Sequence, residues 1–204
     1  GTFVSDHVEI LQKLGHDVKV VNPLPIMLKY QEASRSTHTG VAKAPKKFTH
    51  GEIEVFSPRF WGLPGHPLPV MTSFSINRKR KIIEKWLGDW RPDLIICHTL
   101  WPVAELTNNL SKNWQVPWIG VVHGHDFDVG INDKNISKPI IRLAKSANHL
   151  VTVSSRLDEI AKSIGVEKSS VIPCHSAVSD EWKKPIKNIY LCLMGPSDRF
   201  KSHD

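Results

Sequence analysis

Short apolar runs that alternate with helical patterns constrain the fold of this sequence more than any other feature. Several of the runs are continuously apolar, as expected of strands covered on both faces, and apolar residues spaced three or four apart follow most of them. The runs occupy residues 18–21, 94–97, 118–122 and 150–153. Strands joined in this way by helical crossovers form parallel sheets. We therefore predict an α/β fold, a Rossmann-like parallel sheet flanked by helices.

The segments between these runs complete the expected order. We predict helices over residues 1–14, 75–90 and 136–147, and a further helix capped by Ser155. Residues 24–50 read as a loop, and we expect a short strand after it, at residues 52–56. Residues 174–187 read as a linker, and a last buried strand follows at 189–194.

Composition limits the classes of protein and partner. The 204 residues carry a net charge of +7, and no apolar run approaches the roughly 18 residues that a membrane span needs. Three cysteines, Cys97, Cys174 and Cys192, without CxxC spacing favour a reducing cytoplasm. The positive charge favours anionic partners, with a plain solvated surface as the equally good alternative.

Polar residues follow the ends of several predicted strands. They are Asn22, Arg59, His98, His123, Asp126 and Ser154. Parallel packing brings such ends to one edge of the sheet, where ligands bind in α/β folds. His123 and His125 with neighbouring carboxylates also suggest a metal site, and Gly124 suggests a sharp turn at which the backbone approaches a ligand.

An ordered set of motifs resembles family 4 glycosyltransferases of the GT-B fold. The set is Gly1-Thr2-Phe3-Val4, Leu14-Gly15-His16-Asp17-Val18, Pro58-Arg59-Phe60, Arg91-Pro92-Asp93-Leu94-Ile95, His98, Trp101-Pro102, Pro117-Trp118, His123-Gly124-His125-Asp126, Val153-Ser154 and Val171-Ile172-Pro173. The resemblance covers nearly the whole chain. It departs at Cys174-His175, where the family usually has Asn-Gly.

The resemblance implies that residues 1–173 form an acceptor-side domain without its first strand. Residues 174–204 would then be a linker and the first strand of a donor-binding domain. The absent first strand would leave a slot of unpaired backbone in the sheet, and residues 1–204 alone would be inactive. Such enzymes transfer a sugar from a nucleotide-diphosphate sugar to a glycan or lipid-linked acceptor with retention, and use no metal or cofactor.

The same resemblance assigns roles to individual residues. His123 would contact the donor sugar near the reacting centre, and Gly1, Thr2 and Gly124 would lie by the diphosphate. The acceptor-side residues would be Arg59, His98, Asp126 and Ser154. We expect a cytoplasmic protein, with no nucleic-acid partner, that contacts anionic lipid at the inner face of the plasma membrane through residues 43–47 and 78–81.

Three other functions remain open from the residues. One is a nucleotide-sugar epimerase of similar shape, which would release sugar without an acceptor. Another is a metal hydrolase that uses the cluster of His123 and His125. The last is a basic binding module without enzymatic activity, whose binding would depend on salt.

Overall fold

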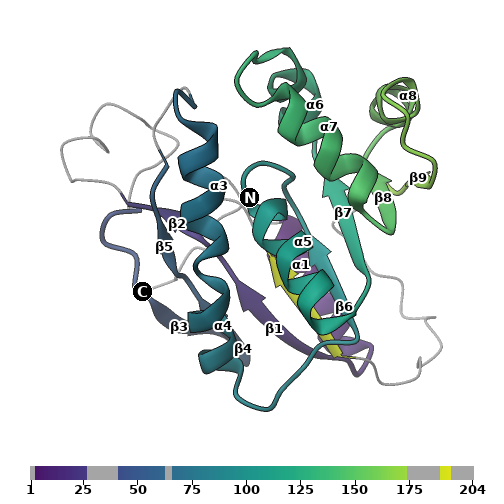
Figure 1. The fold of residues 1–204 in the computed structure, drawn as a ribbon. Helices are drawn as coiled ribbons and strands as arrows, with labels where there is room; N and C mark the ends of the chain where they lie inside the picture. The colour runs from purple at the N-terminus through teal and green to yellow at the C-terminus, as the bar shows by residue number, and fades with distance from the viewer. Residues whose placement is uncertain (1–2, 27–40, 63–65, 174–188, 194–204) are drawn as a thin grey trace.

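A twisted sheet of eight strands runs through the protein, in the order β3-β4-β1-β10-β6-β7-β8-β9 (Figure 1). The computed structural model describes residues 3–26, 41–62, 66–173 and 189–193. The strands are β1 (Asp17–Val21), β3 (Lys47–His50), β4 (Ile53–Phe56), β6 (Leu94–Cys97), β7 (Trp118–Val122), β8 (His149–Thr152), β9 (Ser169–Val171) and β10 (Ile189–Leu193). All neighbours pair in parallel except β3 and β4. The predicted α/β class and its four core strands are therefore confirmed.

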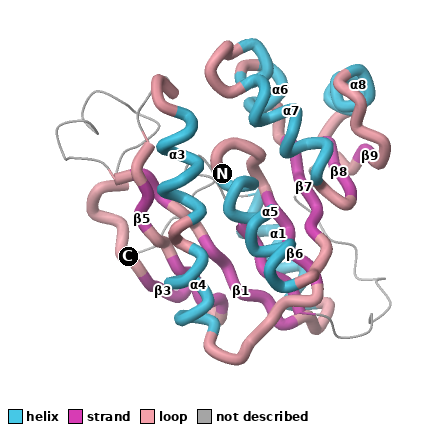
Figure 2. The backbone as a smooth tube through the Cα atoms, viewed as in Figure 1, coloured by secondary structure: helices cyan, strands magenta, loops and turns pink. Residues whose placement is uncertain are grey.

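Helices cover the sheet, and loops join them to the strands (Figure 2). They are α1 (Phe3–Lys13), α3 (Pro69–Asn77), α4 (Arg80–Leu87), α5 (Val103–Trp114), α6 (His125–Asp128), the 3-10 turn η2 (Gly130–Asn132), α7 (Ser137–Ser146) and α8 (Ser155–Ser163). A two-stranded pair, β2 (Leu24–Pro25) and β5 (Arg59–Phe60), lies apart from the main sheet.

The helix predicted over residues 75–90 is instead two helices. α3 begins at Pro69, a residue that suits the first turn of a helix, and α4 begins only at Arg80. Between them the backbone tightens, because the Lys79 amide donates to the carbonyl of Ile76 three residues back. Four consecutive basic residues, 78–81, lie at this junction. The N-terminus of α4 carries a partial positive charge, which repels these cations. The N-cap of α8 is likewise Ser154 and not Ser155.

Alternate residues of the strands feed two apolar cores, one on each face of the sheet. On one face, Val18, Val20, Ile96, Val121 and Cys192 pack with the apolar stripe of α1. On the other face, strand residues such as Ile95, Trp118 and Leu191 pack with α4, α5, α7 and α8. Coverage of both faces explains why the strands read as continuous apolar runs.

The last strand corrects one expectation. Ile189–Leu193 is a strand, as predicted, and β10 lies between β1 and β6 and pairs with both in parallel. It occupies the middle of the sheet, so the expected slot of unpaired backbone is filled. β10 is an apolar strand, and its residues Leu191, Cys192 and Leu193 are buried. It pairs its backbone with both neighbouring strands and contributes side chains to both cores. The proposed boundary after residue 173 stays a prediction.

Candidate active site

His123 follows the carboxyl end of β7, near the middle of the sheet. Its side chain is half-buried, and Gly124 after it has φ +116, a conformation that residues with a side chain rarely adopt. A Cβ atom on Gly124 would also lie 3.0 Å from Oδ2 of Asp128. The glycine therefore permits the turn by which the chain leaves β7 and enters α6.

Three imidazoles form a continuous chain beside this turn. His98 Nδ1 lies 3.1 Å from His123 Nε2, and His98 Nε2 lies 3.3 Å from His7 Nδ1. The rings of His98 and His123 stack, whereas those of His7 and His98 meet edge to face. The three residues come from α1, the loop after β6 and the loop after β7, and the fold brings them together across the sheet edge.

Burial keeps the central ring of this chain uncharged. His98 is 3% exposed, and desolvation together with its two imidazole neighbours holds its pKa well below the usual value of 6.5. Desolvation and the nearby His123 also lower the pKa of His7. Near neutral pH both His7 and His98 are therefore neutral, and each neutral ring has one donor and one acceptor nitrogen.

The sequence predicted His98 and His123 at this edge but missed His7. The predicted helix showed only its apolar stripe of Val4, Val8 and Leu11, and His7 lies beside that stripe. A polar residue next to the buried side of a helix gave a weak signal, because nothing in the sequence showed that α1 crosses the sheet edge next to His98.

Asp126 holds the loop that carries His98. Its Oδ2 accepts a hydrogen bond from the Leu100 amide at 2.9 Å, and its Oδ1 accepts one from the Trp101 amide at 3.1 Å. The carboxylate is 6% exposed, so these charge-assisted bonds form away from water. The geometry gives Asp126 a structural task at the site, whereas its contact with an acceptor stays a prediction.

The other predicted site residues are not part of the histidine chain. Arg59 is in β5, and its Nη2 donates to the Ala44 carbonyl at 2.7 Å. Asn22 follows β1, and its buried Oδ1 has no hydrogen-bond partner among the described residues. Gly1 and Thr2 lie outside the described residues, so their predicted place by a diphosphate has no structural counterpart.

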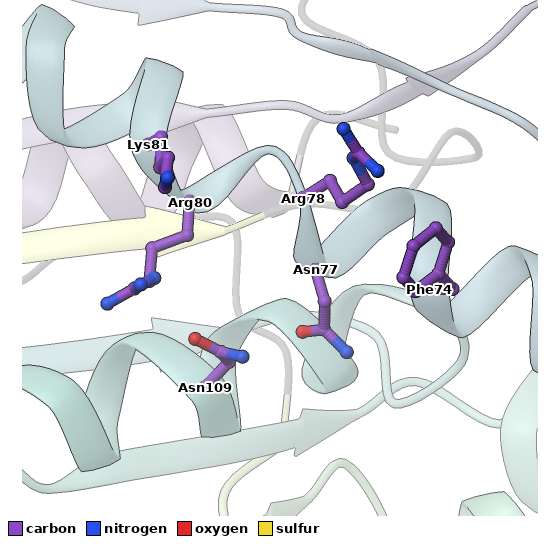
Figure 3. Close-up of a pocket in the computed structure, with 6 residues that line it drawn as sticks. All are labelled: Phe74, Asn77, Arg78, Arg80, Lys81 and Asn109. Carbon is purple, nitrogen blue, oxygen red and sulfur yellow. The ribbon is translucent and has the colours of Figure 1, made fainter.

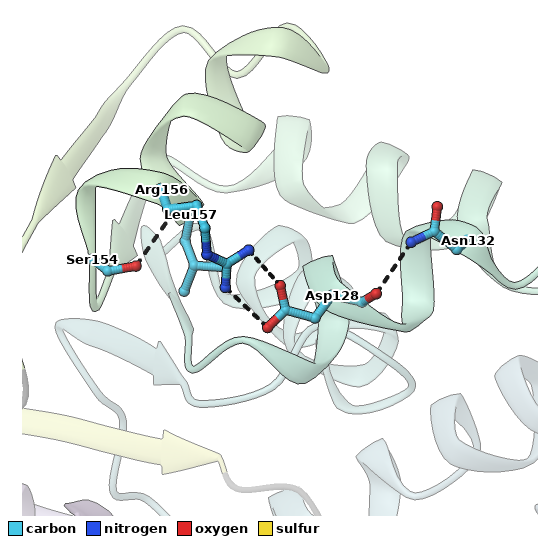
Figure 4. A network of polar contacts seen from close by, with 5 residues as sticks. All are labelled: Asp128, Asn132, Ser154, Arg156 and Leu157. Carbon is cyan, nitrogen blue, oxygen red and sulfur yellow. Dashed lines mark hydrogen bonds and ion pairs between the residues drawn. The ribbon is translucent and has the colours of Figure 1, made fainter.

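Ser154 caps α8, where a set of polar contacts lies between α8 and α6 (Figure 4). Its Oγ accepts a hydrogen bond from the Leu157 amide at 3.4 Å. Next to it, Arg156 binds both carboxylate oxygens of Asp128 at 2.7 and 3.1 Å, which ties α8 to α6. This network also packs against the turn at Gly124, because Oδ2 of Asp128 is the atom that a Cβ on Gly124 would meet.

The described residues contain no group of three or more histidine, cysteine or acidic side chains arranged to hold a metal ion. In the histidine chain, ring nitrogens face one another at hydrogen-bond distance and not a common point. His125, the second histidine of the predicted metal cluster, is exposed on α6. The site therefore offers positioned imidazoles, which can hold a hydroxyl group, and no ligand set for a metal hydrolase among the described residues.

Comparison with known proteins assigns the chain to a family. The family model of Glycosyltransferase Family 4 matches residues 1–175. A protein of Bacillus subtilis (strain 168), described as a teichuronic acid biosynthesis glycosyltransferase, TuaC, is 28% identical over 176 residues. The match covers 85% of this chain and 44% of that protein, so the chain spans less than half of its relative's length. From the family match over most of its length, this chain belongs to glycosyltransferase family 4.

Proposed function

We propose that this chain is the acceptor-side part of a retaining glycosyltransferase. The enzyme would transfer a sugar from a nucleotide-diphosphate sugar to a glycan or lipid-linked acceptor. Membership of family 4 supports transfer, and the name of the Bacillus subtilis relative supports a polysaccharide pathway. The observation that carries the proposal is His123, a half-buried imidazole held at the end of a central strand by a neutral neighbour.

The reaction explains why a positioned imidazole is useful at this place. When the bond between the sugar and the diphosphate breaks, positive charge develops on the sugar ring. An oriented imidazole that contacts a sugar hydroxyl stabilises that state more than the ground state, and because it is already in place it costs no reorganisation. A nucleotide-sugar-binding domain beyond the sheet edge would complete the cleft, with Gly124 close to the diphosphate.

The decisive experiment replaces His123 in the intact enzyme. We expect His123→Ala to lower kcat for sugar transfer by about a hundred- to a thousandfold, as loss of a positioned contact to a transition state typically does. The matched control is His125→Ala, because His125 is exposed two residues away and lies outside the histidine chain. Transfer rates and thermal unfolding midpoints are measured for both variants.

Two outcomes of this experiment would overturn the proposal. One is near-normal transfer by His123→Ala, and the other is loss of activity that comes only from unfolding. Assays with and without a glycan acceptor are run in parallel. Release of free sugar or its epimer in the absence of acceptor would identify the epimerase and not the transferase.

We also propose that the enzyme contacts an anionic membrane. No helix in the described part of the chain is long and apolar enough to cross a bilayer. An exposed apolar surface is nevertheless present on α3 and the neighbouring end of β5, where the Trp61 amide donates to Ser75 Oγ at 2.7 Å. We call it the α3 surface; its members are Trp61, Leu68, Val70, Met71 and Phe74, which are between 48% and 79% exposed.

Basic residues border the α3 surface, as a lipid headgroup contact requires. Phe74 lines a pocket of about 380 Å³ together with Asn77, Arg78, Arg80, Lys81 and Asn109 (Figure 3). Arg78 also stacks over the Phe74 ring, with its guanidinium carbon 5.4 Å from the ring centroid. Apolar side chains next to cations suit the boundary between acyl chains and anionic headgroups, which would place the acceptor side at the inner face of the plasma membrane.

The second predicted membrane patch receives less support. Lys43, Lys46 and Lys47 are exposed, but the apolar residues exposed most strongly lie on the α3 surface. Lys47 Nζ also lies 5.9 Å from the centroid of the Phe56 ring of its own sheet. The proposed contact therefore uses residues 78–81 and the α3 surface.

A further inference from the structure

The chain of three imidazoles has a consequence for the proton of His123. His98 is buried and uncharged, so it carries a single ring proton. Both of its ring nitrogens lie within hydrogen-bond distance of another imidazole nitrogen, at 3.1 and 3.3 Å. One nitrogen of His98 must therefore donate while the other accepts.

Only two arrangements of protons satisfy both contacts. In the first, the His7 Nδ1–H donates to His98 Nε2, and the His98 Nδ1–H donates to His123 Nε2. In the second, every proton lies on the other partner: the His123 Nε2–H donates to His98, and the His98 Nε2–H donates to His7. Any other placement of the protons on these three rings, with His98 neutral, would leave two protons, or none, between one pair of rings. A buried polar group would then lack its hydrogen bond.

The two arrangements give His123 opposite properties at its remaining nitrogen. When Nε2 of His123 accepts, a neutral ring carries its proton on Nδ1, which is then a donor. When Nε2 donates, Nδ1 of a neutral ring has a lone pair and is an acceptor. Whether His123 offers a donor or an acceptor to a sugar hydroxyl is therefore coupled, through His98, to the proton position of His7.

We propose that His7 is a positioning residue, which acts through His98 to hold His123 in a single tautomer. This proposal rests on the proposed function only for its kinetic effect, because the tautomer of His123 is a property of the protein itself. His7 lies on α1 and His123 after β7, so the packing of α1 on the sheet brings His7 to the far end of the histidine chain. His98 would orient the ring of His123, and His7 would orient the ring of His98. Hydrogen-bond partners orient the functional histidines of metal sites in the same way.

Substitutions at His7 separate this role from simple packing. His7→Leu fills the space but can neither donate to nor accept from His98 Nε2. His7→Asn carries its amide close to the place of Nδ1 and can do either, so it restores the contact. His125→Ala is the control for the loss of a histidine outside the chain.

The first measurement is the tautomer of His123, from ring ¹⁵N chemical shifts of the intact enzyme labelled in histidine. We expect one tautomer in the unsubstituted protein, in His7→Asn and in His125→Ala, and a mixture of both in His7→Leu. The second measurement is steady-state transfer. We expect kcat to fall about ten- to a hundredfold in His7→Leu with little change in KM, and to recover in His7→Asn.

The outcomes distinguish this inference from the proposed function. A single, unchanged tautomer of His123 in His7→Leu would overturn the inference, even if His123 proves essential. Should His7→Leu fail to fold, a mixture of tautomers in the unsubstituted enzyme or in His7→Asn would overturn it equally. If the tautomer changes as expected while His123→Ala still transfers sugar normally, the proton order stands and the proposed function fails.

Discussion

At the scale of single residues, the buried histidines make stability depend on pH. His7 and His98 have pKa values below the 6.5 of an ordinary histidine, because burial disfavours their charged forms. Below about pH 6.5 the unfolded chain therefore binds protons that the folded protein does not. The contribution of these two histidines to stability is fully present above about pH 6.5, and it is lost as the pH falls toward their lowered pKa values in the folded protein.

We expect the free energy of unfolding to decrease between pH 7.5 and 5.5. Each imidazole that stays neutral contributes up to about 1.4 kcal/mol per pH unit to the slope, and His98→Gln should remove one such contribution. Denaturant unfolding at several pH values measures this slope. The carboxylates of Asp128, Asp133 and Asp158 also have lowered pKa values, but these start from 3.8, so their effect on stability lies at lower pH. Equal slopes for the unsubstituted protein and His98→Gln would show that His98 is not kept neutral by the fold.

At the scale of elements, α3 carries apolar residues on two sides. Ile76 is fully buried in the core, whereas Val70 and Phe74 are 79% and 62% exposed. Exposed apolar side chains that are gathered on one element indicate an interaction surface and not chance exposure. In the proposed membrane contact, its basic neighbours at 78–81 would favour an anionic lipid surface.

We expect Phe74→Ser to weaken binding to vesicles that contain anionic lipid by about tenfold or more, because the aromatic side chain no longer leaves water. Ile172→Ser is the matched control, since Ile172 is 57% exposed but follows β9, the strand at one end of the sheet, and is not part of the α3 surface. Flotation with anionic and with neutral vesicles measures binding. Equal flotation with both kinds of vesicle, or an equal loss in Ile172→Ser, would count against the membrane proposal.

At the scale of the whole molecule, β10 connects the two halves of the sheet. It lies between β1 and β6, and its residues enter both cores. Leu191 belongs to the core on the face covered by α4 and α5, and Cys192 belongs to the core on the face covered by α1. Burial raises the pKa of the Cys192 thiol to about 12, so the reactive thiolate is almost absent at neutral pH.

We expect Leu191→Ala to lower the free energy of unfolding by about 2–5 kcal/mol, the usual cost of a cavity in a close-packed core. Ile172→Ala, at a residue that is 57% exposed, should change it by less than about 0.5 kcal/mol. Denaturant unfolding gives both values. Thiol labelling of Cys192 checks the placement independently: labelling should be no faster than global unfolding, and rapid labelling of the native protein would show that β10 is not in the sheet.

The sequence by itself determined the local elements and part of the site. The runs at 94–97 and 118–122 became β6 and β7 with the same bounds, because continuous apolar stretches between turn residues have few other solutions. His98 and His123 were predicted at one sheet edge because parallel strands bring their carboxyl ends together, and their rings do meet.

Only the tertiary structure decided which elements lie next to one another. The run at 189–194 is compatible with any strand position covered on both faces, so its place between β1 and β6 could not be inferred from the sequence. His7 is 91 residues from His98 in sequence, and the packing of α1 on the sheet creates their contact. The exposure of α3 likewise follows from packing, because burial of Ile76 leaves Val70 and Phe74 outside. Helices and strands are determined largely by interactions between residues that are close in sequence. Pairings between distant segments depend on the sum of all contacts in the folded chain.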